Sequence, residues 1–143
     1  MNIAFYVDSL AENEQTKQIY KCLNDAIKEQ KVSDASVFYN TPAFNLDAAK
    51  FGLFNSTELW SFTGLLVNTT IQGAIYSLNV VNKFKPVYLF KKDRDVMGLI
   101  HLASKMPILV TNGQDEQEVY RLTGKRPKLV NLDAESLIEA NNE

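Results

Sequence analysis

Apolar and polar positions follow one another along this chain in blocks that predict strands and helices in turn. Short, continuous apolar runs predict buried strands at residues 3–7, 35–39, 64–68, 86–90, 108–111 and 128–132. Apolar residues at helical spacing, such as Ile19, Leu23 and Ile27, predict a helix after the first strand. Further helices are expected over residues 71–78 and 96–103, between Asn112 and Gly124, and after Asp133.

The order of these elements indicates the fold class. A strand and a helix recur about every twenty residues, and each strand is apolar along its whole length. The pattern therefore predicts one α/β domain over residues 1–143, with a Rossmann-like, doubly wound and mostly parallel sheet of about six strands and helices on both faces. Residues 43–62 are the least regular part, where Asn55 and Glu58 predict a single helical turn through Trp60.

Four polar clusters follow the predicted strands, where a doubly wound sheet binds its ligands. Our candidate ligand-binding residues in these clusters are Asp8, Ser9, Asn68, Thr69, Thr70, Lys91, Asp93, Thr111, Asn112 and Gly113. Asp8 is the best single candidate for catalysis, although the sequence shows no partner for it. Asn, Asp, Ser and Thr are also the residues that cap helices, so each cluster has the alternative interpretation of a cap. Lys91 to Asp95 can equally be a solvated loop that ends in a cap.

Several standard active-site motifs are missing from these strand ends. Residues Asp8 to Asn13 contain no glycine, which excludes a dinucleotide-binding loop. Gly113 is followed by Asp115 and Glu116, which would repel a phosphate, so a Walker loop is excluded as well. Asn68 stands where a response-regulator receiver would need an aspartate, and the chain has no G-x-S-x-G elbow of a serine hydrolase.

One cysteine and one histidine limit metal and redox chemistry. Cys22 lies beside the apolar stripe of the first helix and is expected to be a core residue. His101 lies one step off the apolar face of the helix over 96–103, and we expect it to be partly buried and hydrogen-bonded. A structural zinc site needs more ligands than these two residues supply. We therefore expect no metal and no cofactor.

Charge and hydropathy restrict the partners. Fifteen basic and seventeen acidic residues give a net charge of −2, without the basic excess of a nucleic-acid or anionic-membrane binder. This balance also provides no obvious electropositive cradle for a diphosphate. The apolar runs are strand-sized, and Met1 leads straight into the first strand without a signal peptide. With a single cysteine, these features predict a soluble protein of the cytoplasm, or of the host cytoplasm if the source is viral.

The strand ends of the second half resemble a known family. The order of Leu65–Thr70, Pro86–Phe90 and Ile108–Asn112, with a helix after each of the first two, resembles the N-terminal half of GT-B glycosyltransferases. The chain also resembles short uncharacterised proteins of T4-like tailed phages, some of which carry a glycosyltransferase label. The glycine-rich loop of the family is missing, and the family's second domain, which binds most of the nucleotide sugar, has no counterpart here. The resemblance thus implies a fold and an ancestry in sugar transfer, without independent catalysis.

Three functional hypotheses remain open. The first is a stand-alone GT-B-like half that binds a partner or a small ligand, such as a sugar or nucleotide sugar, and does not turn it over. The second is a subunit of a split glycosyltransferase whose donor domain lies on another chain. The third is a regulatory interaction protein, possibly viral. The strand over 128–132 could be an open sheet edge that supports a homodimer.

Overall fold

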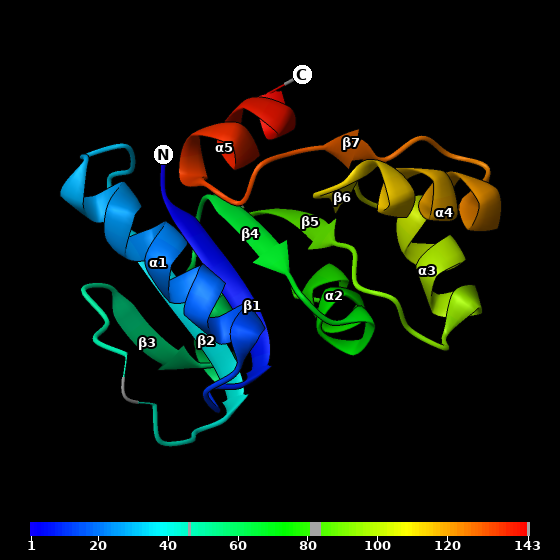
Figure 1. Ribbon diagram of the computed structural model, residues 1–143. Helices are drawn as coiled ribbons and strands as arrows, with labels where there is room; N and C mark the ends of the chain where they lie inside the picture. Colours follow the sequence, from blue (N-terminus) through cyan, green and yellow to red (C-terminus); the bar gives the residue numbers. More distant parts are fainter. Residues whose placement is uncertain (46, 81–83, 143) are drawn as a thin grey trace.

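Seven parallel strands form one sheet in the order β3-β2-β1-β4-β5-β6-β7 (Figure 1). The computed structural model describes residues 1–45, 47–80 and 84–142. Within these ranges the strands are β1 (Ile3–Ser9), β2 (Ala35–Thr41), β3 (Gly52–Asn55), β4 (Leu65–Asn68), β5 (Lys85–Leu89), β6 (Ile108–Val110) and β7 (Lys128–Leu129). This order confirms the predicted Rossmann-like α/β fold, with one strand more than the six expected.

The additional strand, β3, lies in the segment that the apolar pattern left irregular. It pairs with β2 at the edge of the sheet, with Leu53 opposite Val37 and Phe54 opposite Phe38. Both Leu53 and Phe54 are about two-fifths exposed, at 40% and 41%. Only Leu53 and Phe54 of this four-residue edge strand have apolar side chains, and a run this short does not mark a strand, which is why the sequence pattern missed it.

All the helices described here except α1, whose cap Asn13 was not predicted, begin after a residue expected to cap them. They are α1 (Glu14–Lys28), the 3-10 helix η1 (Ser56–Ser61), α2 (Ile71–Leu78), α3 (Val96–Ala103), α4 (Gly113–Thr123) and α5 (Ala134–Asn142). The side chains of Thr70, Asp95 and Asn112 accept hydrogen bonds from amides in the first turns of α2, α3 and α4 at 2.8–2.9 Å. Asn55 caps η1, which confirms the helix start expected there, although η1 runs to Ser61 and is longer than the single turn predicted.

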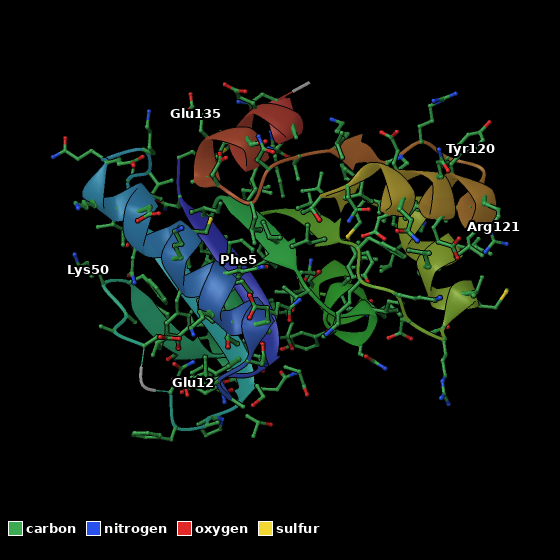
Figure 2. The ribbon with its side chains drawn as sticks, in the orientation of Figure 1. Phe5, Glu12, Lys50, Tyr120, Arg121 and Glu135 are labelled. Carbon is green, nitrogen blue, oxygen red and sulfur yellow. The ribbon has the colours of Figure 1, made fainter. Side chains whose placement is uncertain are left out.

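The helices cover the sheet in two layers. α1 and α5 pack on one face, where Ile19, Leu23 and Leu137 are fully buried, and Phe5 of β1 lies beneath α1 (Figure 2). α2, α3 and α4 pack on the other face around Leu102. The chain leaves β1 towards the first face and β4 towards the second. The two neighbouring strands β1 and β4 therefore form the topological switch point of the sheet.

The expectations for individual residues had mixed outcomes. Cys22 is buried in the layer between α1 and the sheet, as predicted. The prediction for His101 is wrong, because its side chain is exposed; Leu99 and Leu102 form the buried face of α3, and His101 lies outside it. The last strand ends at Leu129 rather than residue 132, because its sole neighbour in the sheet, β6, has three residues. Among the described residues, no helix has the length and apolar character that crossing a membrane requires.

Candidate functional site

A small hollow opens at the switch point, at the carboxyl ends of β4 and β5. It has a volume of about 180 Å³. Its lining comes from α1, from the start of α2 and from the loop after β5, and it consists of Gln15, Thr69, Thr70, Gln72, Tyr88, Lys91, Lys92 and Asp93. Four of our candidate residues, Thr69, Thr70, Lys91 and Asp93, thus meet around one hollow. The other candidates lie elsewhere.

Asn68 and Thr69 fasten the end of β4 to its two neighbours. The Thr69 hydroxyl donates to the carbonyl of Tyr6 in β1 at 2.8 Å, and the Asn68 amide Nδ2 donates to the carbonyl of Val87 in β5 at 3.1 Å. Both side chains are buried. Asn68 Oδ1 has no hydrogen-bond partner among the described residues, which is unusual for a buried oxygen. These two residues hold the switch point together, and Thr69 also lines the hollow.

Two lysines give the hollow its positive charge. Lys91 and Lys92 are exposed, and neither forms an ion pair with another residue in the described ranges. Asp93 is held by its own loop, since its Oδ1 accepts the amide of Asp95 at 2.8 Å. The first turn of α2 adds amide groups at the positive end of the helix dipole. Together these groups suit an anion.

The hollow contains no evident nucleophile or acid–base pair. Burial raises the pKa of Tyr88 to about 12, so its phenol is protonated at neutral pH. The Tyr88 hydroxyl lies 3.4 Å from the carbonyl oxygen of Lys91, to which it donates. The remaining titratable groups of the lining are Lys91, Lys92 and Asp93. This set can bind and orient a ligand, and it resembles no standard catalytic constellation.

Asp8, our catalytic candidate, is placed away from this hollow. It lies at the end of β1, where Nδ2 of Asn40 donates to its Oδ1 at 3.1 Å. Oδ1 of the same Asn40 accepts the hydroxyl of Tyr6 at 2.6 Å, and burial raises the pKa of that phenol. The parallel pairing of β1 with β2 brings these side chains together, so the sequence could not reveal the partner of Asp8. The structure thus gives Asp8 a polar partner, Asn40, and places it outside the lining of the hollow.

The remaining candidates are a turn residue, the cap and the first residue of α4, and one residue of a different cavity. Ser9 Oγ accepts the amide of Ala11 at 3.1 Å, and Asn112 caps α4 next to Gly113. Thr111 lines a second, larger cavity between α1 and the segment from β7 into α5. The sequence analysis did not predict that cavity, because it interpreted Asp133 only as the cap of α5. The structure confirms that Asp133 caps α5.

Comparisons of this chain with protein-family models, with curated proteins and with solved structures found no match. The resemblance to GT-B glycosyltransferases and to phage proteins therefore stays a prediction.

Proposed function

We propose that this chain is a non-catalytic binding domain that holds a small anionic ligand in the switch-point hollow. The observation that carries the proposal is the meeting of Lys91, Lys92, Thr69 and Thr70 around one hollow at the place where doubly wound sheets bind ligands. The positive end of α2 faces the same region, and helix N-termini favour anions.

The size and charge of the hollow narrow the ligand class. A volume of about 180 Å³ suits one phosphate group with a small sugar or acid attached, and is small for a whole nucleotide sugar. Two lysines complement a single phosphate or carboxylate group better than a diphosphate. A phosphorylated sugar thus agrees with the size and charge of the hollow, and with the ancestry in sugar transfer that the resemblance to GT-B glycosyltransferases implies.

The absence of a catalytic pair supports binding without turnover. In the described part of the chain, Asp8 contacts Asn40 and lies outside the lining of the hollow, and Cys22 is buried on the α1 side of the sheet. The single buried thiol also agrees with a reducing compartment, and we propose a cytoplasmic location on that ground.

Calorimetric titration tests this function. We expect glucose 6-phosphate and inorganic phosphate to bind, and a Lys91→Ala/Lys92→Ala variant to bind about tenfold more weakly because the charge complement is lost. Lys105→Ala removes an exposed lysine outside the hollow and should leave the affinity unchanged.

Two further titrants separate the alternatives. UDP-glucose should bind no more tightly than glucose 6-phosphate. Tighter binding of UDP-glucose would favour the glycosyltransferase subunit instead. If none of these ligands gives heat at about 10 mM, a ligand-binding function is contradicted. The hypothesis of a regulatory interaction protein would then remain.

A further inference from the structure

A second cavity, larger than the switch-point hollow, lies on the opposite helix layer. It has a volume of about 650 Å³, within the range of roughly 300–1,000 Å³ that is typical of small-molecule pockets. Thr111 at the end of β6 and Asn131 after β7 line it, so it also opens at the carboxyl edge of the sheet. We call it the α1–α5 pocket, because α1 and the start of α5 form its walls.

The floor of the α1–α5 pocket is apolar. Four residues that line it are buried and nonpolar, namely Cys22, Ala26, Val130 and Ala134. Cys22 serves here as a packing group, since burial, followed by the nearby charges of Asp133 and Asp25, raises the pKa of its thiol to about 12. The floor therefore suits the aliphatic part of a ligand, and the thiol is not a nucleophile at neutral pH.

The walls of the pocket carry an excess of negative charge. Its lining includes four carboxylates, Asp25, Glu29, Asp133 and Glu135, against the two lysines Lys21 and Lys31. Lys31 is already paired, with its Nζ 3.6 Å from Oε2 of Glu135 (Figure 2 labels Glu135 at the start of α5). One lysine is left to balance the three other carboxylates of the lining.

One of these carboxylates is fixed in place by the fold. Oδ1 of Asp133 accepts the amide of Ser136 at 2.7 Å, which holds the side chain at the start of α5. Asp25 lies across the pocket on α1. Both residues line the pocket together with Cys22. A cationic group between them would stand directly above the apolar floor.

We propose that the α1–α5 pocket binds a small organic cation, an alkylammonium or alkylguanidinium whose charged group lies between Asp25 and Asp133 and whose aliphatic stem covers Cys22 and Ala26. A metal ion fits this pocket less well. Among the described residues, no three Asp, Glu, Cys or His side chains are arranged to hold a metal ion. An inorganic anion is disfavoured by the carboxylate excess. This site is separate from the switch-point hollow and does not depend on the function proposed there.

Agmatine is a suitable probe, because it combines a guanidinium, an ammonium and a four-carbon stem. Titration followed by amide chemical shifts should move signals of α1 and of residues 131–135. Butane-1,4-diol, which has the same stem without charge, and succinate, which has the opposite charge, should bind at least tenfold more weakly than agmatine.

Charge variants then locate the site. Asp133→Asn keeps a good capping residue at the start of α5, and Asp25→Asn changes an exposed side chain, so both should fold. Each should weaken agmatine binding about tenfold. Glu139→Gln is the matched control, since it removes one negative charge from the exposed side of α5 without touching the pocket, and it should change the affinity less than twofold.

The outcomes decide the proposal in either direction. Selective agmatine binding that is about tenfold weaker in Asp133→Asn and in Asp25→Asn, and nearly unchanged in Glu139→Gln, supports it. No shifts with agmatine at about 10 mM, equal binding of succinate, or equal weakening by Glu139→Gln would overturn it.

Discussion

The Thr69 hydroxyl donates a hydrogen bond to the carbonyl of Tyr6 at 2.8 Å, across the switch point of the sheet. The backbone amide of Thr69 donates to the same carbonyl at 3.2 Å. One carbonyl in the middle of β1 thus receives two donors from Thr69, directly after the end of β4. This double contact sets the position of the first turn of α2 and of the hollow beside it.

Removing the hydroxyl tests this contact. Thr69→Val keeps the shape of the buried side chain, and the amide of residue 69 still satisfies the Tyr6 carbonyl. We expect the free energy of unfolding to fall by about 1 kcal/mol, measured by urea denaturation. The exposed Thr57→Val is the control and should change stability by less than about 0.5 kcal/mol. Equal effects of the two substitutions would show that the hydrogen bond contributes nothing.

Asn68 allows a stronger test of the buried strand end. Its side chain is fully buried, and Asn68→Asp would place a carboxyl group there. Burial raises the pKa of such a group in the folded state, so the variant should lose at least about 3 kcal/mol of stability at pH 7. Because the folded pKa lies above the unfolded value, the loss relative to wild type should shrink as the pH falls towards about 4. A pH-independent difference between the two proteins would argue against this burial.

The Cys22 thiol predicts a pH dependence in the alkaline range. Its pKa is raised to about 12 in the folded protein, chiefly by burial, whereas an unfolded thiol has a pKa of about 8.5. The unfolded state therefore releases its proton first, and the thiol's contribution to stability falls as the pH rises from about 8.5. The free energy of unfolding of wild type should exceed that of Cys22→Ala by an amount that declines above this pH. Denaturation curves of the two proteins measure this difference. A difference that stays constant up to pH 10.5 would contradict the burial of the thiol.

Two glycines of α4 form a matched pair. Gly124 ends the helix with φ +73°, a left-handed conformation, and its amide donates to the Tyr120 carbonyl at 2.9 Å. Gly124→Ala should lower the free energy of unfolding by about 1 kcal/mol. Gly113 begins the same helix with free space around its Cβ position, so Gly113→Ala should be neutral or slightly stabilising. Thermal unfolding of the two variants would reveal the difference, and a reversed order would refute this description of the helix ends.

Local signals in the sequence were sufficient for much of this fold. Asn55, Thr70, Asp95 and Asn112 cap helices because their short polar side chains reach amides only a few residues away. The central strands are buried on both faces, so their continuous apolar runs marked them clearly. The apolar run of the edge strand β3 was too short to mark it, since only Leu53 and Phe54 contribute apolar side chains. The exposed position of His101 depended on which face of α3 meets the sheet.

The candidate sites were predicted less completely, because they depend on contacts between distant segments. Thr69 and Lys91 were expected at strand ends, and parallel pairing of β4 with β5 brings both to one hollow. The Asn40 partner of Asp8 is 32 residues away in the chain. The α1–α5 pocket forms only when α5 returns to the face that carries α1, and no local pattern predicts that return.

The central claim is that the switch-point hollow binds an anion. Amide chemical shifts recorded during titration with glucose 6-phosphate test it most directly. The account predicts saturable shifts at Thr70 and Gln72, which need about tenfold more ligand in Lys91→Ala/Lys92→Ala and are unchanged in Lys105→Ala. Shifts centred on Ser9 at the end of β1 or on the helix cap Asn112, or spread without saturation over the exposed lysines, would contradict it.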